Sequence, residues 1–99
     1  MLRSEVFTMN KCVRAVISGK VQGVYFRIFT QQEAEHLHLS GWVRNLPTGE
    51  VEALISGPSG QVDKMVEWLT MGSPSSRVDH VAVEEVTCAE SLFGFSIRY

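Results

Sequence analysis

A short uncharged loop followed by an arginine is the part of this chain best suited to bind an anion. Residues 21–26 carry no charged side chain, and Arg27 follows them directly. Gly23 lets the backbone turn so that N–H groups face one point, and the start of a following helix adds partial positive charge there. The Arg27 guanidinium supplies a planar set of donors that suits phosphate oxygens. The segment predicts a phosphate-binding loop; a simple glycine turn with a solvated arginine is the alternative.

Asn45 is the second residue that could take part in chemistry. It ends the run Gly41-Trp42-Val43-Arg44-Asn45, two residues before Pro47. Strands disfavour asparagine, and starting the turn at Pro47 is one sufficient explanation for its presence. A neutral amide beside an anion site has another use, because it can orient a water molecule without repelling a phosphate. Both interpretations stay open on the residues alone.

Several other catalytic arrangements lack the residues they require. A Walker loop after Gly19 would need Gly-Lys where Val24 and Tyr25 stand, and no Cys-x5-Arg motif occurs. The two aspartates, Asp63 and Asp79, fall in a predicted helix and a late strand, which argues against an aspartyl-phosphate intermediate. The chain therefore offers no evident nucleophile beside the predicted loop.

The histidines and cysteines do not have the spacing of metal ligands. His36 and His38 are two residues apart in a predicted helix and so point in different directions, and His80 stands alone. Cys12 and Cys88 are too few and too far apart for a zinc framework. We expect two free thiols, packed as small hydrophobic side chains in a reducing compartment. A disulfide is the less expected alternative, and it requires the first strand to lie beside the strand that ends near Cys88.

The bulk composition is that of a small soluble domain. Its 99 residues, 44% hydrophobic and 20% charged, suffice for one hydrophobic core. A net charge of −2 argues against a nucleic-acid-binding surface. No apolar run approaches the ~20 residues that span a bilayer. Residues 1–10 lack the apolar centre of a secretory signal, so we expect them to be a loose N-terminal extension of a single domain over 11–99. We expect a cytoplasmic monomer that binds neither nucleic acid nor a membrane, and no metal or cofactor.

Hydrophobic periodicity predicts the elements that must position the candidate residues. Strand-like alternation occurs in five segments: 12–19, 42–46, 50–55, 77–87 and 95–99. Helical spacing occurs in two: 28–39, and a stretch with Ser59 as a predicted N-cap and Gly72 as the residue after its end. Proline and glycine at 47 and 49 predict a hairpin between the second and third strands. On the third strand, Glu50 and Glu52 are expected on a solvated face.

The order of these elements predicts the fold. It reads β-α-β-β-α-β with a short C-terminal strand, which is the split βαβ arrangement. We therefore predict a ferredoxin-like α+β domain, in which two helices cover one face of an antiparallel sheet.

Two long segments of the chain resemble the signatures of the acylphosphatases. Residues 19–27, Gly-Lys-Val-Gln-Gly-Val-Tyr-Phe-Arg, are similar to the first signature. Residues 41–45, with Gly49, Val51 and Gly57 at their spacings, are similar to the second. Residues 72–77 and 95–99 also resemble members of the family, so the resemblance covers about residues 12–99.

The resemblance implies a ferredoxin-like fold and hydrolysis of the carboxyl-phosphate bond of acyl phosphates without metal or cofactor. It assigns phosphate binding to Arg27 and positioning of the attacking water to Asn45. It also implies that backbone amides of the loop hold the phosphoryl oxygens of the substrate, or inorganic phosphate or a similar anion. The matching loop residues are Gln22, Gly23, Val24, Tyr25 and Phe26.

The chain departs from the family pattern at two positions. His38 stands where many members have glycine at the end of the first helix, and Thr48 stands where aspartate is frequent. Histidine tolerates a left-handed backbone less well than glycine, so we expect a small loss of stability at His38. Since fold alone does not define function, the alternative is a non-catalytic phosphate or carbamoyl-phosphate binding module, related to the acylphosphatase-like domains of hydrogenase-maturation proteins.

Overall fold

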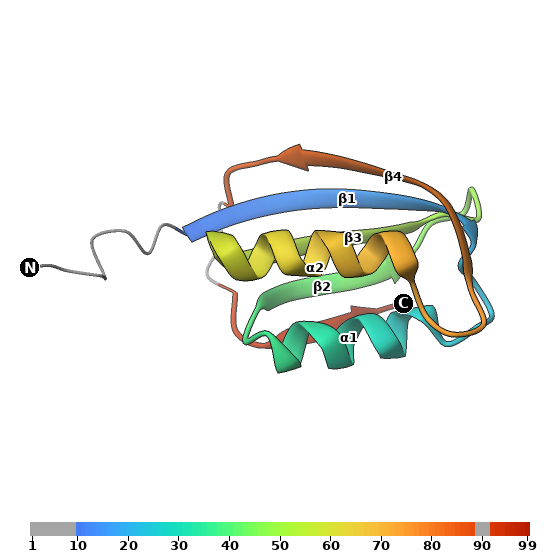
Figure 1. Ribbon diagram of the computed structural model, residues 1–99, viewed down its shortest axis with the longest axis horizontal. Helices are drawn as coiled ribbons and strands as arrows, with labels where there is room; N and C mark the ends of the chain where they lie inside the picture. Colours follow the sequence, from blue (N-terminus) through green and yellow to red (C-terminus); the bar gives the residue numbers. More distant parts are fainter. Residues whose placement is uncertain (1–9, 89–91) are drawn as a thin grey trace, which may run out of the picture.

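Two helices pack against one face of a five-stranded sheet (Figure 1). The computed structural model describes residues 10–88 and 92–99. The elements follow the predicted order: β1 (Asn10–Lys20), α1 (Phe26–His36), β2 (Ser40–Asn45), β3 (Val51–Pro58), α2 (Ser59–Met71), β4 (Arg77–Glu85) and β5 (Phe95–Arg98). The predicted ferredoxin-like α+β fold is confirmed. In the described part of the chain, neither helix has the length and apolarity that a membrane span requires.

The sheet is mixed, which corrects the expectation of an antiparallel one. Its strand order is β4-β1-β3-β2-β5, and β5 pairs with β2 in parallel while the other neighbours are antiparallel. The reason lies in the register. Cys12 and Ser40 both pair with Ser56, and Glu85 at the end of β4 pairs with Val13, so β4 ends where β2 begins. The chain leaves β4 at the end of the sheet where β2 begins. Because β5 starts from that same end, it runs in the same direction as β2.

The core confirms the predicted hydrophobic pattern. Alternate residues of β1 and β3 are buried on the helix-covered face, including Ala15, Ile17 and Ala53. Both helices bury a stripe at helical spacing against these strands: Phe26, Thr30 and Ala34 in α1, and Val62, Met65 and Leu69 in α2. Phe26, the first residue of α1, belongs to this stripe, so the start of α1 is packed against the sheet.

The predicted element ends differ from the observed ones in places. α1 begins at Phe26, so Arg27 lies inside its first turn rather than before it. Ser59 is the first residue of α2 and not its N-cap, because β3 runs into the helix without a loop and Pro58 takes the N-cap position. Gly72 directly follows α2 with a positive φ of 78°, but it is the C-cap residue and its ψ of −168° lies outside the left-handed helical region. Asn10 already belongs to β1, and residues 1–9 of the expected extension lie outside the described residues.

His38 has the left-handed backbone that its position predicted. Its φ is 58°, and its N–H donates to the carbonyl of Glu35 at 3.0 Å. The next N–H, of Leu39, donates to the carbonyl of Ala34 at 2.9 Å. These two bonds form a Schellman motif, in which glycine is the preferred left-handed residue.

Replacing His38 with glycine is expected to stabilise the protein by about 0.5–1 kcal/mol, because the left-handed backbone is strained only for residues with a Cβ. For a domain of this size, this corresponds to a rise of about 2–8 °C in Tm, measured by thermal unfolding. The matched control is His36→Gly inside α1, which should lower Tm. An unchanged or lower Tm for His38→Gly would contradict the assigned strain.

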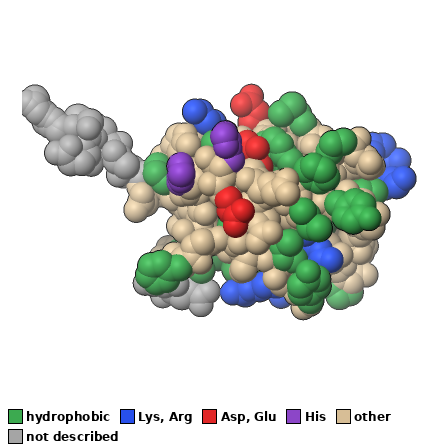
Figure 2. Space-filling model, turned by 90° about the horizontal axis from the view of Figure 1, so that it is seen from below, with side chains coloured by type: hydrophobic (Ala, Val, Ile, Leu, Met, Phe, Trp, Pro, Cys, Tyr) green, Lys and Arg blue, Asp and Glu red, His purple; other side chains and the backbone are tan. Residues whose placement is uncertain are grey.

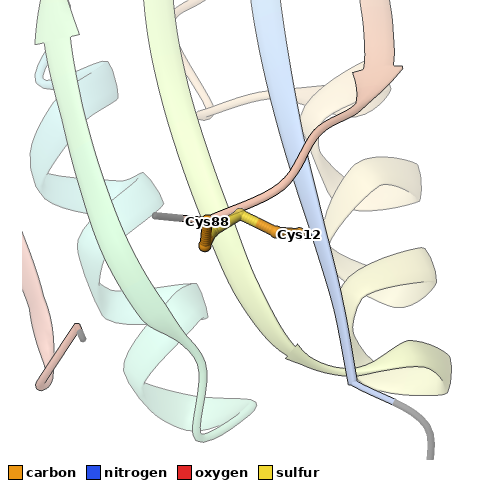
Figure 3. The surroundings of a disulfide bond; sticks show 2 residues. All are labelled: Cys12 and Cys88. Carbon is orange, nitrogen blue, oxygen red and sulfur yellow. A yellow bond between two sulfur atoms is a disulfide. The ribbon is translucent and has the colours of Figure 1, made fainter. Parts of the chain in front are cut away.

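Cys12 and Cys88 form a disulfide (Figure 3), so the expectation of two free thiols is wrong. The condition stated for a bridge is met, because β1 pairs with β4. The N–H of Val86 also donates to the carbonyl of Cys12 at 2.8 Å. This bond extends the β1–β4 pairing past the end of β4, and it brings the Cα atoms of the two cysteines to 6.0 Å. The two cysteines are 76 positions apart in the sequence, so no local pattern indicated that they lie together.

Reducing the disulfide is expected to lower the free energy of unfolding by about 2–4 kcal/mol, because the bridge closes a long loop in the unfolded chain. Urea unfolding with and without dithiothreitol measures the difference. In Cys88→Ser, the midpoint should be lowered already and should not respond to the reductant. Equal midpoints for oxidised and reduced wild type would contradict the expectation.

Glu52 is buried, at 4% exposure, although its strand face was expected to be solvated. Arg14 from β1 and Arg44 from β2 both donate to its carboxylate, Arg44 over 2.6 Å. Burial raises the pKa of Glu52, but the hydrogen bonds from Arg44 and Arg14 outweigh it and hold the pKa below the ordinary value of 4.5. The two arginines come from the strands on either side of β3, so this pairing depends on the sheet register.

The lowered pKa of Glu52 makes stability depend on acidity. The ionised carboxylate stabilises the folded state above the ordinary pKa of 4.5, and this contribution is lost as the pH falls through the lower folded-state pKa. In Glu52→Gln, we expect a lower free energy of unfolding at neutral pH than in wild type. As the pH falls below the ordinary pKa, the free energy of unfolding of this variant should decline less steeply. Urea unfolding over a pH series measures both, with the exposed Glu35→Gln as control. A decline as steep as that of wild type would contradict the assignment.

Candidate active site

A pocket of about 360 Å³ opens where the loop after β1, the start of α1 and the ends of β2 and β5 meet. Arg27 and Asn45, the two residues singled out in the sequence, both line it. The complete lining consists of Val21, Gly23, Tyr25, Phe26, Arg27, Ile28, Asn45, Ile97 and Tyr99. In Figure 1 this loop lies at the right-hand end of the molecule, with the C-terminus beside the start of α1.

The loop backbone has the geometry of an anion site. Gly23 and Tyr25 have left-handed φ angles of 74° and 59°, and α1 begins directly afterwards at Phe26. The N-cap Tyr25 forms no side-chain cap, and the first turn contains no acidic residue. The first N–H groups of a helix have no partner within it, and left-handed turns aim neighbouring N–H groups at one point. The loop and the helix start can therefore hold an anion.

Arg27 is oriented by the last residues of the chain. Its Nη1 donates to the carbonyl of Arg98 at 3.1 Å, and its Cζ lies 4.7 Å from the ring centroid of Tyr99. The hydrogen bond and the cation–π contact fix one side of the guanidinium. An arginine has five N–H donors, so others remain for a ligand in the pocket.

Asn45 lies at the end of β2 and pairs with Val51 of β3. Its Oδ1 is buried and has no hydrogen-bond partner among the described residues. The turn is closed by backbone bonds, from Leu46 to Glu50 at 2.8 Å and from Gly49 to Leu46 at 3.1 Å. The turn interpretation of Asn45 therefore explains nothing about its side-chain oxygen. A buried acceptor without a partner is costly, and a bound water would satisfy it.

Gln22 connects the loop to the hairpin. Its Nε2 donates to the carbonyls of Leu46 and Glu50, at 2.9 and 2.8 Å. Its side chain therefore positions the loop relative to Asn45 and does not line the pocket. Val24 is also absent from the lining and is buried in the core. Of the five predicted loop residues, Gly23, Tyr25 and Phe26 line the pocket.

Four lining residues were not predicted as site residues: Val21, Ile28, Ile97 and Tyr99. Val21 is the first residue of the uncharged loop and Ile28 follows Arg27, so their closeness could have been inferred from the sequence. Ile97 and Tyr99 reach the pocket because β5 pairs with β2, and no local pattern indicates that pairing.

The electrostatics of the pocket are simple. Arg27 is the one charged residue that lines it. Within residues 10–88 and 92–99, no group of three or more His, Cys, Asp or Glu is placed to hold a metal ion. The arrangement can thus bind a compact anion through backbone amides and a guanidinium, next to an amide oxygen able to hold a water.

Known proteins of one family are similar to this chain. Residues 13–97 match the family described as Acylphosphatase. An acylphosphatase of Rubrobacter xylanophilus is 50% identical over 89 residues, which cover 90% of this chain and 81% of the relative. One of Acaryochloris marina is 52% identical over 79 residues, covering 80% of this chain and 85% of the relative.

Solved structures show the same fold. The crystal structure of acylphosphatase from Bacillus subtilis superposes with a TM-score of 0.86 at 42% identity, covering 92% of this chain and 100% of that one. Full-length HypF in its phosphate- and nucleotide-bound form matches with a TM-score of 0.80 at 26% identity. That match covers 92% of this chain but 12% of HypF.

Proposed function

The chain belongs to the acylphosphatase family and is an enzyme, and we propose that Arg27 and Asn45 are its catalytic residues. The reaction is the hydrolysis of an acyl phosphate to a carboxylate and inorganic phosphate. Acyl phosphates are already activated, so positioning and charge stabilisation can supply most of the catalysis. The chain requires no strong nucleophile of its own for this reaction.

The phosphoryl group is held by Arg27 and by backbone amides of the loop from Gln22 to Phe26. Left-handed turns at Gly23 and Tyr25 and the uncapped start of α1 support this role for the amides. In the transition state, charge is spread over the phosphoryl oxygens, where fixed N–H donors stabilise it without reorganisation. Inorganic phosphate, as the product, binds in the same place.

Asn45 holds the attacking water. The water oxygen forms a bond to phosphorus while the bond from phosphorus to the acyl oxygen breaks, and the carboxylate leaves with that electron pair. The carboxylate is a weak base and requires little protonation. A phosphoryl oxygen takes the proton that the water loses, since no acidic side chain or histidine lines the pocket. The neutral Asn45 amide orients the water without repelling the phosphate dianion.

The buried Asn45 Oδ1 is the observation that carries this proposal. It has no partner among the described residues, and Asn45 lines the pocket that Arg27 also lines. A purely structural asparagine would use its side-chain oxygen within the protein.

The test is hydrolysis of benzoyl phosphate, followed by the loss of its ultraviolet absorbance with EDTA present. We expect rapid EDTA-resistant hydrolysis and competitive inhibition by inorganic phosphate. Binding of phosphate without hydrolysis by the folded wild type would favour the alternative, a non-catalytic phosphate or carbamoyl-phosphate binding module.

A monomeric state and a cytoplasmic location complete the proposal. Size-exclusion chromatography tests the first. For the second, cell fractionation measures where the protein accumulates. The disulfide between Cys12 and Cys88 opposes a cytoplasmic location, because disulfides are rare in the cytoplasm. Recovery of the protein outside the cytoplasmic fraction would contradict the proposal.

A further inference from the structure

The walls of the active-site pocket are apolar beyond the groups that would hold phosphate. Tyr25, Ile28, Ile97 and Tyr99 line it together, and we refer to these four residues as the apolar rim. Three of them are open to solvent: Tyr25 is 73%, Ile28 44% and Tyr99 99% exposed. Figure 2 shows hydrophobic side chains gathered at the right-hand end of this face, where Figure 1 places the loop.

Exposed hydrophobic groups around a pocket favour an apolar ligand. The phosphoryl group takes the only charged residue of the lining, Arg27. A second negative charge on the acyl part of a substrate would then find no further cation in the lining. The lining therefore disfavours acyl groups that carry a carboxylate or a second phosphate.

The conformation of Tyr25 adds an independent reason. Its backbone is left-handed, with a φ of 59° and ψ of 22°, in which a bulky side chain is unusual. Glycine or asparagine would occupy this position with less strain. The strained turn holds an exposed aromatic ring in the lining of the pocket, where it can contact whatever is attached to the phosphoryl group.

We propose that the apolar rim is an acyl-group subsite, which selects acyl phosphates whose acyl group is uncharged and apolar. This inference rests on the proposed function, since it concerns the leaving group of the same reaction. Each methylene group buried against the rim contributes about 0.8 kcal/mol, or roughly fourfold, when burial is complete. An open rim buries only part of a short chain.

The experiment compares kcat/KM for three substrates: acetyl, pentanoyl and succinyl phosphate. Acetate and pentanoate have similar basicity as leaving groups, so the difference between these two substrates reports contacts of the acyl group. The free carboxylate of succinyl phosphate can displace phosphate intramolecularly, so its uncatalysed rate is measured and subtracted. For wild type we expect pentanoyl phosphate to exceed acetyl phosphate by about tenfold. Succinyl phosphate, which is similar in length to pentanoyl but carries a carboxylate, should fall below both.

Two variants test the apolar rim through the ratio of kcat/KM for pentanoyl phosphate to kcat/KM for acetyl phosphate. A loss of activity that affects both substrates equally does not change this ratio. Tyr25→Asn removes the aromatic ring, and asparagine tolerates the left-handed backbone at this position. Ile28→Gln removes apolar surface and leaves the turn at Tyr25 unchanged. We expect the ratio to fall to about two- to threefold in Tyr25→Asn and to an intermediate value in Ile28→Gln. The matched control is Phe29→Asn, because Phe29 is similarly exposed in α1 but does not line the pocket. Its ratio should equal that of wild type.

The outcomes separate this inference from the proposed function. If wild type hydrolyses all three substrates at equal efficiency, or if both rim variants keep the wild-type ratio, the subsite is wrong while the hydrolase stands. If succinyl phosphate is the best substrate, the subsite is also wrong. If wild type hydrolyses none of them, the proposed function fails and the subsite with it. A ratio that falls in both rim variants and stays constant in Phe29→Asn supports the subsite.

Discussion

Replacing Arg27 with alanine is expected to lower kcat/KM for benzoyl phosphate by at least about 10²–10³-fold, equivalent to ~3–4 kcal/mol. That range is typical for removing one preorganised donor, and here a positive charge is lost as well. The Arg27 guanidinium is already oriented by the Arg98 carbonyl and the Tyr99 ring, so its donors need little reorganisation during the reaction. Steady-state rates measured by absorbance give the ratio directly.

Two variants control for charge and for folding. Arg27→Lys keeps the charge but loses the planar set of donors, so we expect activity between those of wild type and Arg27→Ala. Arg77→Ala removes an exposed arginine that pairs with Asp79 outside the pocket, and it should leave the rate unchanged. Near-normal hydrolysis by Arg27→Ala, with native circular dichroism, would show that another group binds the phosphoryl oxygens.

Replacing Asn45 with alanine is expected to reduce kcat by about 10²–10³-fold while changing KM less than about threefold. The reason is that Asn45 is assigned to the water and not to the substrate, so its loss acts in the transition state. The inhibition constant of inorganic phosphate should stay close to that of wild type. Full kinetic curves with benzoyl phosphate, together with phosphate inhibition, separate the two effects.

The stability of Asn45→Ala distinguishes catalysis from structure. Because Oδ1 has no partner within the described residues, its removal breaks no bond there, and the free energy of unfolding should not fall. In Asn45→Asp the shape is kept but a negative charge faces the phosphate, so we expect the phosphate inhibition constant to rise as well. A large loss of stability in Asn45→Ala, or a KM effect that accounts for the whole loss of activity, would contradict the assigned role.

Patterns within a few residues predicted much of this protein. A strand or helix that buries one face repeats its hydrophobic residues with the period of that element. The alternation in β1 and β3 and the hydrophobic stripe of α2 could therefore be predicted without knowing the fold. The hairpin turn was predicted for the same reason, since its chemistry is local, whereas the left-handed His38 was predicted from the family resemblance. Arg27 and the preceding loop were recognisable because an anion site can be built from consecutive residues.

The sequence by itself thus determined the order of the elements, the buried faces and the candidate residues Arg27 and Asn45. Only the tertiary structure decided what meets across the sheet: the parallel pairing of β5 with β2 that brings Tyr99 to Arg27, and the bridge between Cys12 and Cys88. The same holds for Glu52, which is buried beneath arginines of two neighbouring strands. Such contacts depend on strand order and register, which arise from packing the whole core and leave no periodic trace in the residues concerned.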